Sequence, residues 1–257
     1  MNDPSELQHG IDMAKDVARI VANAADGRVR LFLEILSDML SIRNFSGNLE
    51  FLIASFSRKR DDLGQWIAYA DNGHGYAIGF APHLFGIEDR KDQKPNENVV
   101  VGLVLYDIKE VCERHQLAID KATEILLRVI EANVQLFADR AVVIPFMQDM
   151  ARAVIASPLI WNCLTTKHPA YAHECEVRLI LLGLTKALSP YITTRLRGSE
   201  IVPYVAHKLP LKKPHSLAEI VVGPSAPIER TVRTLLRSLG YSPDIPVSKS
   251  DIPYRSL

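Results

Sequence analysis

A long helix-like stretch from about Lys109 to Ala156 is the feature that most constrains the fold of this chain. It contains no proline before Pro145, which we interpret as the break between two helices, because proline lacks the backbone donor that a helix interior needs. The stretch predicts a helical hairpin, inserted at about residues 109–160 between segments that are typical of β-strands. Strands that lie before and after one helical insert favour an α+β fold over alternating βαβ units.

Strand-like segments flank this insert on both sides. The predicted strands cover residues 51–57, 76–80, 99–106, 174–182, 200–205 and 218–222. The tail from Ile245 to Tyr254 contains prolines that suit an edge strand and not a central one. From these segments we predict a mixed or antiparallel central sheet.

Helical patterns also occur near both ends of the sequence. Apolar residues recur at helical spacing from Pro4 to Leu40, and the turn signal Asp26-Gly27 predicts a split within this N-terminal segment. Residues 228–239 form an amphipathic pattern that Gly240 closes, as expected for a glycine just after a helix. We take residues 1–257 as a single α+β domain that contains the helical insert.

The composition limits the classes of function. Hydrophobic residues make up 47% of the 257 positions and charged residues 23%, as in ordinary globular proteins, and 30 basic residues balance 30 acidic ones. Zero net charge disfavours bulk binding to DNA or RNA, which requires a basic excess to neutralise phosphates. The longest apolar runs are too short to span a bilayer, so no membrane association is expected.

The cysteines and the first residues bear on the cellular location. Cys112, Cys163 and Cys175 are too few, and odd in number, for a disulfide framework, and they fit a reducing compartment. The sequence does not begin with a basic region followed by an apolar core, so no signal peptide is expected. We therefore predict a cytoplasmic protein. Its oligomeric state stays open, because the apolar stripe of the insert suits a dimer interface, a lid or packing on the sheet.

Two serines on one predicted strand are the first candidate binding residues. Ser55 and Ser57 point to the same face of that strand, whereas Phe56 points to the other. Hydroxyls on an otherwise apolar strand need hydrogen-bond partners, which either a ligand or neighbouring backbone supplies. Both interpretations stay open at this point.

Two aromatic residues follow on a short helix predicted for residues 61–69. Trp66 and Tyr69 are three residues apart, which places them on a shared helix face. They would either pack on a ring of a ligand or belong to the core. The next residues, 71–75, form a turn of types that tolerate left-handed backbone angles.

Charged residues alternate along the predicted strand 174–182. Glu174, Glu176 and Arg178 fall on one face, and the apolar continuation of the strand indicates a central position in the sheet. This face either lines a cleft or is held by ion pairs between Arg178 and the glutamates. Two nearby carboxylates raise each other's pKa, which suits acid–base chemistry, whereas Arg178 opposes that shift.

The sequence contains a set of four residues of metal-binding types and lacks several common catalytic motifs. Cys163, His168, His173 and Cys175 are of types that bind zinc, but their spacing matches no standard zinc motif, so no metal is expected. A zinc-dependent hydrolase that uses this set stays the third alternative for function. The sequence has no phosphate-binding P-loop, no Gly-x-Ser-x-Gly elbow, no Rossmann glycine motif and no His-Glu-x-x-His motif.

Motifs along nearly the whole chain occur together in one order. They are Asn2-Asp-Pro-Ser-Glu6, Ser55-Phe-Ser57, Gln65-Trp66, Tyr69, Gly75-Tyr-Ala-Ile-Gly-Phe80, Glu174-x-Glu176-x-Arg178, Ile220-Val-Val-Gly-Pro224 and Ser250-Asp-Ile-Pro-Tyr-Arg255. Together they resemble the bacterial family catalogued as domain of unknown function 2971. That family has a strand with paired tyrosines upstream of its Asn-Asp-Pro element, which has no counterpart in this sequence.

The layout of this family is similar to that of ADP-ribosyltransferases. The resemblance implies an enzyme that uses NAD, either an ADP-ribosyltransferase or an NAD glycohydrolase, in a toxin or phage-defence role. Ser55 and Ser57 would line the NAD pocket, Trp66 or Tyr69 would pack on a ring, and Arg178 would belong to the same binding set. The usual first motif, an Arg or His on an early strand, would fall in the region upstream of this sequence.

The same resemblance gives the two glutamates catalytic roles. Glu176 would hold the nicotinamide ribose and stabilise the cation that forms as nicotinamide leaves, as carboxylates do in glycoside hydrolysis. Glu174 would deprotonate the acceptor. The main alternative is a non-catalytic module for ligand sensing or protein interaction, which would use the same cleft only to bind.

Overall fold

The computed structural model describes residues 4–25, 27–43, 49–85, 99–206, 209–226 and 229–254. Contacts divide the chain into two compact units. The helical unit comprises residues 1–53, 102–172 and 181–190, and the sheet unit comprises residues 54–101, 173–180 and 191–257. Both units are assembled from separate stretches, so no single cut in the sequence separates them. Sequence predictions for Asn2, Asp3, Asp26, Ile228 and Arg255 lie outside the described residues.

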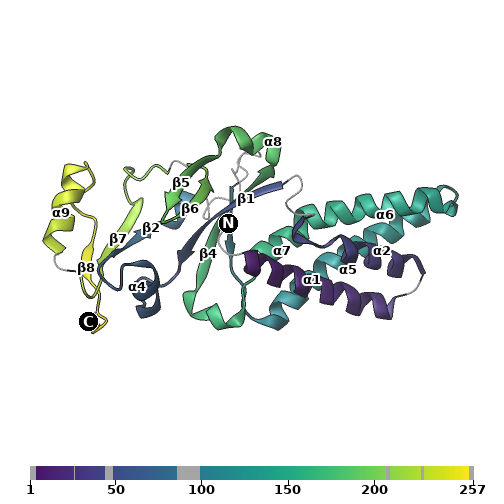
Figure 1. Ribbon diagram of the computed structural model, residues 1–257, viewed down its shortest axis with the longest axis horizontal. Helices are drawn as coiled ribbons and strands as arrows, with labels where there is room; N and C mark the ends of the chain where they lie inside the picture. The colour runs from purple at the N-terminus through teal and green to yellow at the C-terminus, as the bar shows by residue number, and fades with distance from the viewer. Residues whose placement is uncertain are drawn as a thin grey trace. The chain divides into compact units, whose positions relative to one another are not determined.

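The helical unit is built from long helices that lie side by side (Figure 1). They are α1 (Pro4–Ala24), α2 (Gly27–Met39), α5 (Ile108–Ala132), α6 (Arg140–Val154) and the short α7 (Ile160–Leu164). The predicted split of the N-terminal segment is confirmed, because α2 begins at Gly27, whose φ of +52° suits glycine. Among the described residues, none of the helices combines the length and the apolar character that crossing a bilayer requires.

The insert forms the predicted helical hairpin, but its break does not lie at Pro145. The first helix ends at the cap residue Asn133, and the second begins after Asp139, whose carboxylate accepts a hydrogen bond from the backbone N–H of Ala141. Pro145 lies inside α6. It falls in the second turn, so the missing donor costs one backbone hydrogen bond near the helix start, and the capping residues decide where the helices end.

The largest fully buried side chains in the described part of the chain belong to the helical unit. They are Phe32, Ile11, Leu33, Leu36, Leu40, Ile119, Leu126, Met147, Leu159, Ile160 and Leu164. Each such side chain contributes about 1.5–3 kcal/mol of transfer free energy when it leaves water. The main apolar core therefore forms between helices that the sequence separates widely.

The sheet unit contains a three-stranded sheet with a small core of its own. Strand order is β2 (Tyr76–Phe80), β7 (Leu217–Val222), β8 (Val247–Lys249); β2 pairs antiparallel with β7, and β8 pairs parallel with it. The tail thus supplies an edge strand, as predicted. Apolar residues of β7, β8 and α9 (Glu229–Ser238) pack together on this sheet.

A β-hairpin of β5 (Thr193–Arg197) and β6 (Glu200–Tyr204) forms a second sheet. Sequence analysis predicted β6 but missed β5. All five residues of β5 are exposed, so neither of its faces needs the apolar alternation that marks a half-buried strand.

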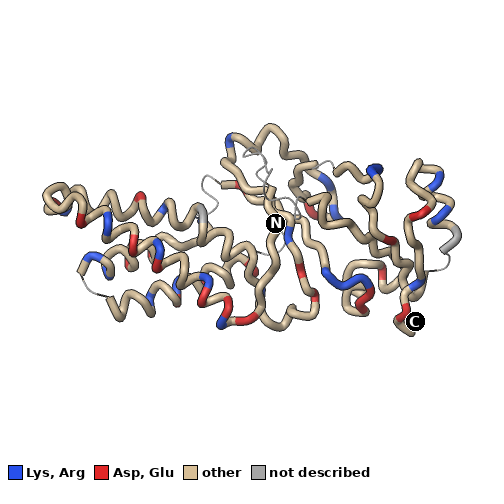
Figure 2. The backbone as a smooth tube through the Cα atoms, turned by 180° about the vertical axis from the view of Figure 1, so that it is seen from behind, with Lys and Arg blue, Asp and Glu red and all other residues tan. Residues whose placement is uncertain are grey.

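A third sheet has the order β1 (Leu49–Ser57), β4 (Glu176–Leu184), β3 (Val99–Leu103), and each of these strands has residues in both units. The central position predicted for the strand after Glu174 is thereby confirmed. The α+β class is confirmed too, although in the part of the chain that the structure describes three small sheets stand in place of one central sheet. Basic and acidic residues are interspersed along the helices of the helical unit, in keeping with the zero net charge (Figure 2).

Candidate functional site

The candidate site lies in the sheet unit, where the end of β1, the helix α4 (Leu63–Tyr69) and the segment that enters β4 come together. Ser57 Oγ donates a hydrogen bond to the backbone oxygen of Glu174 at 2.7 Å and accepts one from the N–H of Lys59 at 3.1 Å. Its hydroxyl therefore bonds backbone, one of the two alternatives that the sequence left open. Ser55 is exposed two residues earlier on the strand.

Phe56 lies between the two serines and packs against other aromatic rings. Its ring centroid is 5.8 Å from that of Phe80 and 5.1 Å from that of Phe85. This aromatic cluster fixes the last residues of β1, and with them the position of Ser57.

Glu174 does not lie on the strand, in contrast to the sequence prediction. It ends a 3₁₀ helix (Pro169–Glu174), and β4 begins only at Glu176. Cys175 between them has a φ of +48°, a left-handed conformation that interrupts strand alternation. The prediction that Glu174, Glu176 and Arg178 share one strand face is therefore wrong for Glu174. The backbone oxygen of Cys175 accepts a hydrogen bond from Arg58 N at 3.1 Å, which holds this kink beside the end of β1.

Glu176 and Arg178 form a buried ion pair. Their residues are 5% and 2% exposed, and the guanidinium binds the carboxylate in a bidentate manner, at 2.9 Å from Nε and 3.1 Å from Nη2. The ion-pair interpretation of this strand is confirmed for Glu176. Pairing of this kind occupies both oxygens of the carboxylate.

Tyr69 and Glu174 are brought together by the fold. Tyr69 is the last residue of α4 and is 67% exposed, and its Oη donates a hydrogen bond to Glu174 Oε1 over 3.5 Å. Glu174 itself is half-buried. A phenol and a carboxylate thus lie next to each other at a surface that a ligand can reach.

Trp66 occupies a different environment from Tyr69. It is 2% exposed, and its indole N–H donates to Asp61 Oδ1 at 2.6 Å. The two aromatic side chains do not present a common face to solvent, because a separation of three residues leaves about 60° between them. The core interpretation describes Trp66, whereas Tyr69 is exposed to solvent.

Asp61 and Asp62 hold the start of α4, and sequence analysis singled out neither. Asp62 caps the helix by accepting a hydrogen bond from Gln65 N, and an aspartate just before a helix is a signal that could have identified it. Asp61 accepts hydrogen bonds from Trp66, from Ser250 Oγ at 2.7 Å and from Asp251 N at 2.9 Å. No local pattern reveals these last partners, because about 190 residues separate them from Asp61.

The environment of Asp61 favours its charged form. Burial by itself raises the pKa of this carboxyl, but the hydrogen bonds from Ser250, Trp66 and Asp251 outweigh burial and lower the pKa below its usual value. Asp61 therefore stays ionised at neutral pH and acts as an acceptor for three donors at once.

The set proposed for zinc finds no support. Among the described residues, no group of three or more His, Cys, Asp or Glu side chains is arranged to hold a metal ion. Cys163 is fully buried, and burial raises the pKa of its thiol to about 12. The Cys163 thiol is therefore protonated at neutral pH in the structure as it stands.

Part of the chain matches the model of a known family. Residues 65–179 match the model of the family described as Protein of unknown function (DUF2971). The resemblance predicted from the motifs is thereby confirmed. No match was found among curated proteins or among solved structures.

The segment that matches DUF2971 contains most of the candidate site. It includes Trp66, Tyr69, Glu174, Glu176 and Arg178. The serines of β1 and the tail residues that bind Asp61 lie outside the matched range, so the DUF2971 segment is completed by parts of the chain before and after it.

Proposed function

We propose that the surface around Tyr69 and Glu174 binds NAD and cleaves its bond between nicotinamide and ribose. The observation that supports this most directly is the convergence of three predicted site residues within hydrogen-bond distance. Ser57 binds the backbone of Glu174, and Tyr69 reaches its carboxylate. An exposed aromatic ring beside a carboxylate suits a ligand that combines flat rings with a sugar that becomes cationic.

The chemistry assigned to Glu174 is that of a glycosyl-transfer carboxylate. The C–N bond breaks and nicotinamide leaves with the electron pair, so positive charge develops on the ribose. Glu174 stabilises that charge, and the oxygen of water or of another acceptor then bonds to the ribose carbon. The proton of the attacking hydroxyl passes to the carboxylate and from there to solvent. With water as acceptor the enzyme is a glycohydrolase; with a protein or nucleotide acceptor it is an ADP-ribosyltransferase.

The role given to Glu176 changes in this proposal. The family resemblance implied that Glu176 holds the nicotinamide ribose and stabilises the cation that forms there. Both oxygens of Glu176, however, bind Arg178 at a buried position. We therefore assign the charge-stabilising role to Glu174. The pair of Glu176 and Arg178 then fixes the start of β4, next to the left-handed Cys175 that directs Glu174.

A second candidate is a module that binds the same ligand without cleaving it. The buried ion pair favours this candidate, because it removes one of the two carboxylates that a two-step mechanism would use. Affinity without turnover would then be the whole function of the site. Tyr69 and Ser55 would contribute to it through their exposed positions.

The test combines NAD binding and nicotinamide release. Labelled NAD is incubated with the protein, alone and with cell lysate, beside Glu174→Gln, Tyr69→Phe and Glu176→Gln. Glu200→Gln, an exposed glutamate on β6, is the matched control. We expect Glu174→Gln to lower turnover about 100-fold or more, as loss of a charge-stabilising group does, and Glu200→Gln to leave it unchanged.

The outcomes separate the candidates. Turnover that survives in Glu174→Gln but disappears in a folded Glu176→Gln would reverse the two roles. Saturable binding that weakens in Tyr69→Phe, with no nicotinamide released by the wild type, supports the binding module. Absence of both binding and release contradicts the proposed use of NAD.

A further inference from the structure

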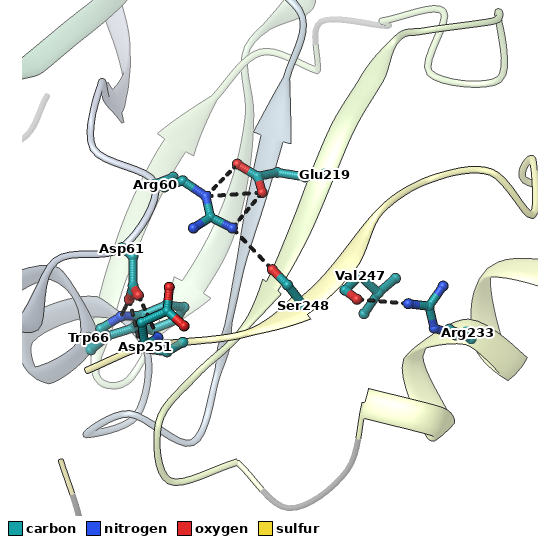
Figure 3. Close-up of polar contacts among 9 residues, drawn as sticks. Arg60, Asp61, Trp66, Glu219, Arg233, Val247, Ser248 and Asp251 are labelled. Atoms are coloured by element: carbon teal, nitrogen blue, oxygen red, sulfur yellow. Dashed lines mark hydrogen bonds and ion pairs between the residues drawn. The ribbon is translucent and has the colours of Figure 1, made fainter. Parts of the chain in front are cut away.

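The C-terminal segment, residues 248–254, is bonded to the loop that precedes α4. Asp61 in that loop accepts hydrogen bonds from Ser250 and Asp251, and the same carboxylate accepts one from Trp66 inside the helix. Figure 3 shows Asp61 between Trp66 and Asp251, on the side of the loop where the tail runs. The start of α4 is thus fixed through one carboxylate that the tail also binds.

A second connection joins the tail to the same loop. Arg60 binds Glu219 of β7 through both carboxylate oxygens, at 2.9–3.1 Å, and donates to Ser248 Oγ of β8 at 3.1 Å (Figure 3). The edge strand β8 is held in turn by Arg233 of α9, whose Nη2 donates to the backbone oxygen of Val247 at 2.8 Å. The tail therefore approaches Asp61 from a strand that is itself anchored.

The same segment also reaches the turn that follows α4. Tyr254 Oη donates to Asn72 Oδ1 at 2.6 Å. The turn is bonded to the helix end, since Gly73 N donates to Trp66 O at 3.0 Å and Gly75 N to Ala70 O at 2.8 Å. Tyr69 lies between these two attachment points, as the last residue of the helix.

The turn has two residues in the left-handed region. Asp71 and Asn72 have φ values of +47° and +53°, which Asp and Asn tolerate better than other residues that carry side chains. Contacts to other segments of the chain then hold the turn in place. Tyr254 supplies one of these contacts, from the end of the described chain.

We propose that residues 248–254 position Tyr69 for its ligand, through Asp61 and Trp66 at the start of α4 and through Asn72 after its end. This inference rests on the proposed function, in which Tyr69 contacts NAD beside Glu174. Asp61 and Tyr254 are positioning residues in this scheme, and they act on the ligand through the placement of the Tyr69 ring.

The first experiment measures the Michaelis constant for NAD in the full chain. Tyr254→Phe keeps the ring and removes the hydrogen bond to Asn72, and we expect it to raise KM about fivefold, the equivalent of one lost hydrogen bond. Tyr204→Phe on the β5–β6 hairpin is the matched control. We expect Asp61→Asn to raise KM as well. Its control is Asp244→Asn, because the wild-type Asp244 carboxylate also accepts a hydrogen bond from a serine, Ser242.

A double-mutant cycle separates positioning from a general loss of stability. If the tail acts through the Tyr69 ring, Tyr254→Phe has no further effect on KM once Tyr69→Ala has removed that ring, so the two changes are strongly non-additive. Additive effects, or a KM for Tyr254→Phe equal to that of Tyr204→Phe, would overturn the proposal. The cycle is run on the binding constant instead if NAD binds without turnover.

Hydrogen exchange keeps the test independent of NAD. We expect the amides of residues 66–75 to exchange about fivefold faster in Tyr254→Phe than in the wild type and in Tyr204→Phe. A wild-type chain that neither binds nor cleaves NAD contradicts the proposed function. Unchanged exchange of residues 66–75 in Tyr254→Phe contradicts the positioning role, whatever the result with NAD. Faster exchange together with the absence of NAD binding would show that the tail holds α4 and its turn, and would overturn its role in positioning Tyr69 for NAD.

Discussion

Cys175 determines which carboxylate is available at the candidate site. Its left-handed backbone ends the alternation of β4, so Glu174 leaves the strand and lies beside Tyr69, while Glu176 turns inward to Arg178. Two carboxylates that are two residues apart in sequence thus have different environments. One is buried and paired, and the other is half-buried at an exposed aromatic ring.

His115 provides a prediction at the residue scale. It is fully buried in α5, and neither ring nitrogen has a hydrogen-bond partner among the described residues. Burial, and to a smaller extent the charge of Arg114, lowers the pKa of His115 to about 4. In the unfolded chain the same group takes up its proton near pH 6.5, so the unfolded state gains protons first as the pH falls.

The stability that neutral His115 contributes is therefore fully present above pH 6.5 and is lost as the pH falls toward 4. We expect the free energy of unfolding to fall by about 2 kcal/mol between pH 7 and pH 5 from this group. Urea unfolding at several pH values measures it, with His115→Leu expected to remove this part of the pH dependence. An unchanged dependence in His115→Leu, or an equal change in the exposed His83→Leu, would contradict the assignment.

At the scale of single elements, the residues at the helix ends decide the boundaries. Asp62, Asp107 and Asp139 each accept a hydrogen bond from the first turn of the helix that follows. Helix α9 closes in another way, with Gly240 at a φ of +75° and Tyr241 N donating to Leu236 O at 3.0 Å. Pro145, which the sequence suggested as a boundary, lies within α6 because these capping contacts lie elsewhere.

Gly240 gives the prediction at this scale. An added Cβ would meet only Lys212 Nζ at 3.9 Å, so space is available and the cost of a side chain lies in the backbone angle. We expect Gly240→Ala to lower the free energy of unfolding by about 1 kcal/mol and Gly240→Asn to cost less, because asparagine tolerates left-handed angles. Urea unfolding of the two variants checks the order; equal losses would contradict the backbone explanation.

At the scale of the whole molecule, the two units carry different tasks. The helical unit holds the largest buried side chains that the structure describes, and the sheet unit holds the candidate site. The residues of the site come from the beginning, the middle and the end of the sheet unit's sequence. Its geometry therefore depends on contacts such as those of Asp61 and not on local patterns.

This division predicts where substitutions affect stability. Leu126 is fully buried in α5. Its replacement by alanine should lower the free energy of unfolding by about 2–5 kcal/mol, because the substitution leaves a cavity between helices. Leu196 on the β5–β6 hairpin is 76% exposed, and its replacement should change stability by less than about 0.5 kcal/mol. Urea unfolding compares the two; a large loss for Leu196→Ala would mean that this hairpin is covered in solution.

Local sequence patterns predict the α+β class, the split N-terminal helix, the helical hairpin and the central position of β4. These follow from the spacing of apolar residues and from turn residues, which act over a few positions. The left-handed turn at residues 71–73 and the glycine that ends α9 were likewise predictable, because local backbone geometry requires such residue types.

Folding of the chain in three dimensions sets how the site residues are arranged. It separated Glu174 from Glu176, placed Trp66 in the interior and Tyr69 at the surface, and joined Asp61 to a tail about 190 residues away. The physical reason is that hydrogen bonds and ion pairs between distant segments leave no periodic pattern in the sequence. Strand periodicity places Glu174 on the same face as Arg178. In the structure the left-handed residue Cys175, whose backbone oxygen binds Arg58 N just after β1, turns Glu174 away from that face.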